Sequence, residues 1–378
     1  MKRLAVLHVV ANPWWTGAAA PALDLAQSLR DRGHAVEFAC VSGDALEARA
    51  RAVHFTPIGG LSLRRTVRPW IILRDLGELR RFICAREIDV VHAHQTHDHW
   101  LAAAATRGLR TTLVRTVHHR RAVHRGPAAR WLFRRTAAVM APSVGIAERL
   151  HQAGVEPERV SIVRGAVDAT PFRSGPDGRQ FRAQLGLGPG PVVGSVARLV
   201  PGRAHDVLLW GARLLREKLA TVRLVLVGRG EGRPDLEALS RRLRLSDVVV
   251  FAGYRGDDLP DALAAFDAFA LLGAGSEESC RAVLEAMAAA KPVVAARVGA
   301  LAETVVDGET GWLVPVEPAA VADRLLRLLT DPTGARRMGE AGRRRVETCF
   351  SLTARAEATE AVYARALKGR AGLRPSGR

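Results

Sequence analysis

Two glutamates separated by seven residues, Glu277 and Glu285, have a spacing that could serve a sugar nucleotide. Glu277 follows the apolar run 267–272, which predicts a buried strand, and Glu285 lies in the predicted helix 280–290. The first amides of a helix have no partner within it and bind anions, so this junction could hold a diphosphate. A loop glutamate beside it could bind sugar hydroxyls, and one inside the helix could reach a ribose. The ordinary alternative is a glutamate that only complements the helix dipole.

Further candidates for binding the phosphates lie in and just before this helix. They are Ser279, Arg281, Ala282 and Val283. Cations follow another predicted strand, at 192–199, where Arg198 and Arg203 precede the predicted helix 205–219. In an arginine-rich chain they could simply be solvated loop residues.

Gly17 lies in the loop 11–21, after the first apolar run at 3–10. Because glycine has no Cβ, Gly17 would let the backbone approach a phosphate or an acceptor. The neighbouring Trp14 and Trp15 could stack on a sugar ring or simply pack. The sequence leaves both roles open for them.

Histidines gather where two predicted strands end. The first group is His92, His94, His97 and His99. Clustered histidines can bind zinc, and the alternative is a histidine-rich strand end that holds no metal. His118 ends the predicted strand 111–118, with His119 beside it as a competitor, and an arginine-rich loop follows.

These residues need elements to position them, and apolar runs alternate with helical patterns along the chain. Such alternation predicts parallel strands joined by helical crossovers. The predicted strands are 3–10, 35–40, 89–94, 111–118, 137–143, 160–167, 192–199, 222–228, 248–253, 267–272, 292–296 and 312–315. The predicted helices are 20–32, 69–87, 145–154, 205–219, 234–244, 258–265, 280–290, 300–306 and 318–329. Residues 334–368 are also predicted helical, with a break near Phe350 and Ser351.

The segment 172–190 is rich in Gly, Pro and charge, which predicts a linker and a short helix. The fold class is therefore α/β, with two doubly wound Rossmann-like domains facing a central cleft. We expect domains at 1–171 and 172–350, and a C-terminal helix at 351–378 that crosses back to the first domain and ends in a frayed basic tail. Ligands of such sheets bind beyond the carboxyl ends of the strands.

The stretch from Gly275 to Val314 resembles the donor-binding signature of glycosyltransferase family 4, the retaining enzymes of the GT-B fold. The matching residues are Glu277, Glu285-Ala286-Met287-Ala288, Pro292-Val293-Val294-Ala295, Gly299, Glu303 and Asp307-Gly308-Glu309-Thr310-Gly311. Residues 196–209 resemble the family's segment that carries two cations to the donor, with Arg203 where lysine is usual. Glu278-Ser279-Cys280 departs from the family's Gly-Phe-Gly, which leaves the donor's identity open.

The resemblance implies a retaining transfer from a nucleotide-diphosphate sugar to a hydroxyl acceptor, such as a glycolipid or a lipopolysaccharide-type envelope glycan. It implies catalytic roles for Glu277 and His118, and donor binding by Gly17, Arg198, Arg203 and Glu285. It also implies that no metal or other cofactor is required, because arginines and helix amides neutralise the diphosphate.

The composition is that of a folded soluble protein with a net charge of +18. The basic stretches 62–81 and 118–135 interleave cations with aromatic residues, which indicates either contact with an anionic membrane surface or two ordinary surface helices. Four unpaired cysteines and the lack of a signal peptide predict a cytoplasmic protein. If the basic stretches do contact a membrane, the protein is expected to lie peripherally on the inner face of the plasma membrane.

Three rival functions differ in what they would bind or make. A GT-B nucleotide-sugar epimerase would convert the donor without an acceptor. A nicotinamide oxidoreductase is suggested by Gly228, Gly230 and Gly232, but Arg233 replaces the expected third glycine. A non-enzymatic nucleic-acid binder would explain the charge, although no recognised binding module is present and no specific nucleic acid is expected.

Overall fold

The computed structural model describes residues 2–12, 19–64, 66, 68–173, 176–273 and 280–371. The chain forms two compact units: unit 1 comprises Met1–Gly165 and Leu352–Arg378, and unit 2 comprises Ala166–Ser351. The division after Gly165 comes six residues before the predicted boundary. Val167 accounts for this, because it pairs with Ser351 and its N–H donates to the Phe350 carbonyl at 3.0 Å.

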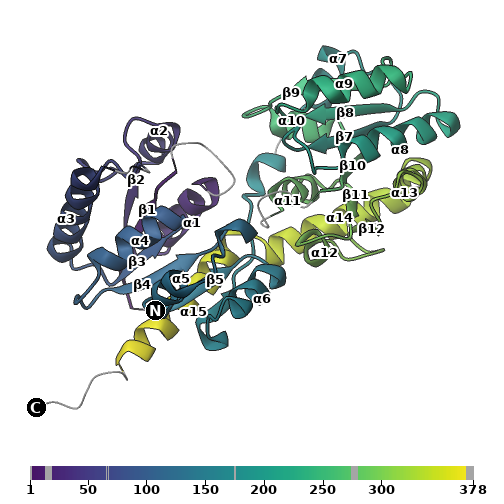
Figure 1. The fold of residues 1–378 in the computed structure, drawn as a ribbon. Helices are drawn as coiled ribbons and strands as arrows, with labels where there is room; N and C mark the ends of the chain where they lie inside the picture. Colours follow the sequence, from purple (N-terminus) through teal and green to yellow (C-terminus); the bar gives the residue numbers. More distant parts are fainter. Residues whose placement is uncertain are drawn as a thin grey trace, which may run out of the picture. The chain divides into compact units, whose positions relative to one another are not determined.

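Unit 1 contains a six-stranded parallel sheet in the order β2-β1-β3-β4-β5-β6 (Figure 1). Its strands are β1 (Ala5–Val10), β2 (Ala35–Cys40), β3 (Val90–Ala93), β4 (Thr112–Thr116), β5 (Ala138–Ala141) and β6 (Val160–Ile162). They are short and rich in valine and alanine, and β3, β4 and β5 are buried throughout. Near-continuous apolar runs of this kind are expected when helices cover both faces of a parallel sheet.

The helices in the described part of unit 1 are α1 (Ala19–Asp31), α2 (Ala45–Ala52), α3 (Pro69–Ala85), α4 (Thr96–Ala105), α5 (Pro127–Arg134), α6 (Val144–Gln152) and α15 (Leu352–Ala371). Periodicity did not predict α2 and α4, whereas α5 falls in the basic stretch 118–135, for which a surface helix was one of the two interpretations. Gln95 and Asp98 form a capping box at the start of α4. Because this box begins with glutamine rather than serine or threonine, it is easily missed in a sequence.

The long C-terminal helix α15 belongs to unit 1, where it packs against α1, β4 and β5. It follows α14 (Pro332–Cys349) after a break at Phe350 and Ser351, where the sequence predicted one. Its Tyr363 is fully buried in the core that α1 and the sheet also form.

Unit 2 repeats the architecture with the sheet order β12-β11-β10-β7-β8-β9. Its strands are β7 (Val192–Val196), β8 (Arg223–Val227), β9 (Val249–Gly253), β10 (Ala268–Leu271), β11 (Val293–Ala296) and β12 (Gly311–Val314). Its helices are α7 (Gly178–Gln184), α8 (His205–Lys218), α9 (Arg233–Arg242), α10 (Leu259–Ala264), α11 (Arg281–Ala288), α12 (Leu301–Thr304), α13 (Pro318–Thr330) and α14. The predicted second series of strands and helices is confirmed, with ends that differ by a few residues.

In each sheet the chain starts in the middle and reverses direction once. The reversal lies between β1 and β3 in unit 1 and between β7 and β10 in unit 2. Loops diverge at such a point and leave a crevice at the carboxyl ends of the strands, where ligands of doubly wound sheets bind. Within the described residues, no helix is both long enough and apolar enough to cross a bilayer.

Candidate active site

The loop after β7 in unit 2 is held by close backbone contact with the loop after β8. A Cβ on Gly230 would lie 2.1 Å from the Leu199 carbonyl oxygen, and one on Gly228 would lie 1.9 Å from the Ala197 carbonyl oxygen. Only glycine fits at such distances. These glycines therefore pack one loop on another, which accounts for the glycine pattern that suggested an oxidoreductase.

Arg203 lies just before α8 and close to the end of β10, the strand on the other side of the reversal. A Cβ on Gly273, just after β10, would lie 2.7 Å from Arg203 Cα. The loops after β7 and β10 therefore touch at the point of reversal. Arg203 is half-buried and Arg198 is exposed. Both predicted donor cations thus belong to the loop at the point of reversal.

The start of α11, which follows β10, also lies at this edge of the sheet. Cys280 precedes the helix with φ of 50°. The Val283 N–H donates to the Cys280 carbonyl at 2.9 Å, inside the first turn of the helix. A phosphate-binding role for the Val283 amide stays a prediction. Buried Glu285 accepts a bond of 2.8 Å from Arg281 Nε. The predicted ribose ligand is therefore paired with a predicted phosphate-site residue.

Several predicted site residues fall outside the described part of the chain. They are Gly17, Glu277 and Ser279, together with Trp14 and Trp15. Their roles stay predictions. The structure places Arg198, Arg203, Arg281, Ala282 and Glu285 at the carboxyl edge of the unit 2 sheet, on the loops and helices that follow β7 and β10.

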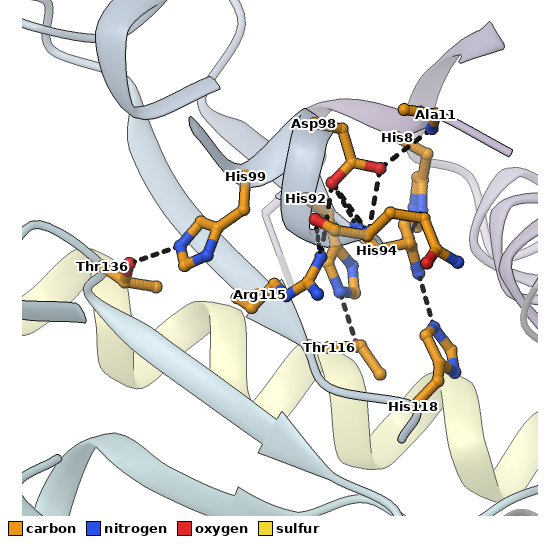
Figure 2. Close-up of polar contacts among 11 residues, drawn as sticks. His8, Ala11, His92, His94, Asp98, His99, Arg115, Thr116, His118 and Thr136 are labelled. Carbon is orange, nitrogen blue, oxygen red and sulfur yellow. Dashed lines mark hydrogen bonds and ion pairs between the residues drawn. The ribbon is translucent and has the colours of Figure 1, made fainter. Parts of the chain in front are cut away.

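The corresponding edge of unit 1 is organised by the buried carboxylate of Asp98 (Figure 2). Asp98 accepts bonds from the backbone N–H groups of Ala11 at 2.9 Å, His94 at 3.1 Å and Gln95 at 2.7 Å. Its fourth partner is the buried guanidinium of Arg115, 3.3 Å away. Burial raises the pKa of Asp98 to about 7, against the pull of Arg115 and of these amides. One side chain thereby ties the loop after β1 to the loop after β3.

Beside Asp98, four histidines form a buried network at the point of reversal. His8 Nδ1 lies 3.0 Å from His94 Nε2, and His94 Nδ1 lies 3.2 Å from His118 Nε2. His92 bonds to the Tyr363 hydroxyl and the Thr116 hydroxyl, each at 2.7 Å. Figure 2 shows His94 and His118 pointing toward each other.

The histidines of this network are neutral in the folded protein. Burial lowers the pKa of His8 to about 3 and holds the pKa values of His92, His94 and His118 well below the usual value. The cation of Arg355, on α15, adds to the effect in all four. As uncharged buried rings, these histidines interact through hydrogen bonds and ring contacts.

The histidines that could hold a zinc ion in the structure differ from the group that the sequence suggested. His8, His92 and His94 each offer a ligand atom, and these atoms lie within 4.8 Å of one another. Both ring nitrogens of His92 and of His94 already take part in hydrogen bonds. His99 lies on α4, where its Nε2 bonds to the Thr136 hydroxyl. These nitrogens are thus engaged in hydrogen bonds here, and the absence of a required metal stays a prediction.

His8, Asp98, Arg115, Tyr363 and Arg355 are the members of this edge that sequence reasoning missed. His8 had a signal, since it is a polar residue inside the apolar run 3–10, and it is in register with His92 on the adjacent β3. Tyr363 and Arg355 had none. They reach the site only because α15 returns to the unit 1 sheet.

Comparisons with known proteins agree with this architecture. Two family models match: "Glycosyl transferases group 1" over residues 177–345 and "Glycosyltransferase Family 4" over residues 15–170. A D-inositol 3-phosphate glycosyltransferase of Streptomyces bingchenggensis is 34% identical over 316 residues, which cover 76% of this chain and 68% of that protein. The chain belongs to glycosyltransferase family 4.

A second relative in this family names a more complex acceptor. It is the GDP-mannose-dependent alpha-(1-6)-phosphatidylinositol monomannoside mannosyltransferase of Mycolicibacterium smegmatis, 37% identical over 186 residues. The match covers 47% of this chain and 49% of the relative, so the chain spans about half the length of that protein. The Anabaena protein Alr3699/HepE, solved with UDP, has a TM-score of 0.82 and 24% identity and covers 96% of this chain and 100% of that one.

Membership confirms the predicted family, the GT-B fold and an enzyme that transfers a sugar from a nucleotide-sugar donor. The two six-stranded parallel sheets, one in each unit, are the two Rossmann-like domains of that fold. The family match spans both units, since one model covers most of unit 1 and the other covers most of unit 2.

Proposed function

We propose that this enzyme transfers a hexose, with retention of configuration, from a nucleoside-diphosphate sugar to a hydroxyl of a cell-envelope glycolipid. The supporting observation is the point of reversal in unit 2, where the loop of Arg198 and Arg203 touches the loop after β10. A pyrophosphate there meets two guanidinium groups and two helix starts, which stabilise the charge that develops on the leaving group. A charged leaving group of this kind is what a nucleotide sugar supplies.

The proposed roles follow from charge and position. Arg203 and Arg198 bind the diphosphate, with the amides of Arg281 and Ala282 at the start of α11. Glu285 binds the ribose, and Glu277 orients the sugar hydroxyls and supports positive charge at C1. The acceptor hydroxyl attacks C1 on the side that the diphosphate leaves, and a phosphate oxygen takes its proton. His118 is the proposed catalytic residue of unit 1.

We propose an inositol-bearing glycolipid as the acceptor. The names of the two relatives support this choice, since one acts on phosphatidylinositol monomannoside and the other on D-inositol 3-phosphate. Both acceptors carry phosphate and hydroxyls. A chain with a net charge of +18 attracts such anions. For the donor, GDP-mannose is the first to try, because the Mycolicibacterium relative depends on it.

A lipid acceptor also requires contact with a membrane surface, and unit 1 exposes suitable side chains. Trp100 on α4 and Trp131 on α5 stack at 5.7 Å, and Arg135 lies 4.3 Å above the Trp131 ring. On α3, which packs against α4, Trp70 is 64% exposed and Leu73 is 65% exposed. Tryptophan and arginine together suit the interface of an anionic bilayer. We propose that this surface docks on it.

The donor site is tested by binding and by products. Thermal shift with UDP-, GDP- and ADP-sugars identifies the base, and NMR of the product gives the anomeric configuration. We expect Arg203→Ala to weaken donor binding about 10- to 100-fold, since it removes a charge-assisted bond. Arg242→Ala, an exposed change at the end of α9, is the matched control. Inversion at C1, equal donor binding by both variants, or a converted donor sugar without an acceptor would each contradict the proposal.

Two further measurements address the metal and the membrane. We propose that transfer needs no metal ion, so activity should persist in excess EDTA, and its loss and recovery with Mg²⁺ would refute this. Co-sedimentation with phosphatidylinositol vesicles should weaken in Trp100→Ser with Trp131→Ser. Trp210→Ser in unit 2, where Trp210 is 47% exposed, should bind as the parent does. Equal sedimentation of all three proteins would exclude the proposed surface.

A further inference from the structure

Three imidazoles of unit 1 form a single hydrogen-bonded chain that ends at His118. His8 comes from β1, His94 follows β3 and His118 follows β4, so the chain crosses the point of reversal. All three side chains are buried, with at most 5% exposed. The two bonds join His8 Nδ1 to His94 Nε2 and His94 Nδ1 to His118 Nε2.

Each ring in this chain carries one hydrogen, because burial and the nearby Arg355 keep all three neutral. In a neutral imidazole one nitrogen donates and the other accepts. A ring in the middle of such a chain must accept on one side and donate on the other. The donors in this series of hydrogen bonds can therefore run from His8 to His118 or from His118 to His8. The direction determines the tautomer of His118.

The far end of the chain distinguishes the two directions. If His118 donates first, the hydrogen of His8 sits on its Nε2, which is buried and has no hydrogen-bond partner among the described residues. A buried N–H without an acceptor is rare in native proteins and costs about 1–3 kcal/mol. If His8 donates first, the same nitrogen carries only a lone pair. Unsatisfied acceptors are the more common exception.

We propose that His8 and His94 are positioning residues that hold His118 as the tautomer with its hydrogen on Nδ1. His8 Nδ1–H then donates to His94 Nε2, and His94 Nδ1–H donates to His118 Nε2. With Nε2 engaged as an acceptor, the remaining ring nitrogen of His118 is a donor. His118 thus offers a hydrogen bond to an oxygen of the sugar or phosphate, and it does not serve as a general base.

Asp98 supports this arrangement from the side. Its carboxylate accepts the N–H of His94 and of Ala11, so the backbones that carry two of the three rings are held by one group. The other titratable groups that act on the chain are His92 on β3, His119 after β4, and the cations of Arg115 and Arg355. None of them occupies either inter-ring bond.

The test reads the tautomer directly in the whole protein. Long-range ¹H–¹⁵N NMR of protein labelled at histidine distinguishes protonated from bare ring nitrogens, and His118→Gln assigns the His118 signals. We expect Nδ1 of His118 to be protonated and Nε2 to be bare at pH 7. The reverse pattern, or a mixture of both, would overturn the proposal. This measurement does not depend on the proposed sugar transfer.

A matched pair at position 8 tests the cause. His8→Asn can donate an amide hydrogen toward His94 and keep the direction, whereas His8→Asp, at a pH where its carboxyl is ionised, offers only acceptors there and should reverse it. We expect the His118 hydrogen to move to Nε2 in the aspartate variant alone. An unchanged tautomer in a folded His8→Asp protein would refute the chain, and far-UV circular dichroism checks folding.

The consequence for catalysis rests on the proposed function. With the donor that binds in the thermal-shift panel, His8→Asp should lower kcat at least about tenfold relative to His8→Asn, with KM for the donor within about twofold. Equal kcat values with a reversed tautomer would show that the tautomer does not matter to transfer. An inactive wild-type protein would instead refute the proposed function, while the NMR result still decides the tautomer.

Discussion

The two units place their chemistry at the same topological point but fill it differently. In unit 1 the reversal between β1 and β3 is occupied by side chains: the neutral histidine network, Asp98 and Arg115, nearly all fully buried. In unit 2 the reversal between β7 and β10 is built by backbone. Glycines bring the loops into contact, and the exposed Arg198 and half-buried Arg203 supply charge.

This difference matches two kinds of task. A buried network of hydrogen-bonded rings can hold its hydrogens in place before a ligand binds. This suits the role proposed for His118, which requires one fixed geometry. Close backbone packing with cations at the edge instead suits a pyrophosphate, which needs donors and charge. The units should therefore respond oppositely to changes in protonation and in backbone volume.

The largest expected difference between the two units is in how much stability each loses at acidic pH. The pKa values of five histidines in unit 1 (His8, His92, His94, His99 and His118) are lowered in the folded state, against His205 in unit 2. Their contribution to stability is complete above their unfolded pKa of about 6.5. It is lost as the pH falls below that value, because the unfolded chain takes up protons that the folded chain refuses. Because the pKa of His8 is about 3 in the folded state, this residue alone should lower the free energy of unfolding by about 2 kcal/mol at pH 5.

Asp98 acts in the opposite sense, because its raised pKa favours the folded state at lower pH. The five histidines outweigh this single carboxyl group. We therefore expect the free energy of unfolding of unit 1 to fall by several kcal/mol between pH 7 and pH 5. Unit 1 should then unfold before unit 2 as the pH is lowered. Hydrogen exchange with mass spectrometry resolves peptides of each unit. Earlier opening of unit 2 would contradict the contrast.

A smaller effect is expected from the ion pair at the centre of unit 1. At a pH above 7, where Asp98 is ionised, Asp98→Asn leaves the Arg115 guanidinium buried without its counter-charge, at a cost of about 3–5 kcal/mol in the free energy of unfolding. Glu217→Gln removes a partly exposed partner of Arg213 on α8 of unit 2 and should cost at most about 1 kcal/mol. Urea titration of both variants measures the two losses, and similar values would argue against a central role for Asp98.

The smallest predicted effect belongs to the backbone contact in unit 2. Gly230→Ala places a methyl group 2.1 Å from the Leu199 carbonyl oxygen, so the loop must shift, at a cost of about 1–3 kcal/mol. Donor binding should weaken with it. Gly77→Ala, in α3 of unit 1, meets no atom within 4 Å and should stabilise the helix by about 0.5–1 kcal/mol. Unfolding and donor titrations compare the pair, and a neutral Gly230→Ala would show that the contact is dispensable.

The elements were accessible from the sequence to different degrees. Strands such as β2 and helices such as α3 follow directly from apolar runs and periodicity, because each buries a face that its own residues define. The signature around Glu285 likewise identified the family. Helix α4 was missed, since its alanine-rich segment has little periodicity and its start depends on Gln95 and Asp98.

By itself, the sequence determined the α/β class, the two units, the family and the residues at the carboxyl edge of unit 2, because these depend on local patterns and on motifs of fixed spacing. Only the tertiary structure decided the histidine chain and the hub at Asp98. Their members lie 86 residues apart from His8 to His94 and 87 from Ala11 to Asp98. No local pattern encodes such a contact; it arises when parallel strands come into register and α15 closes over them.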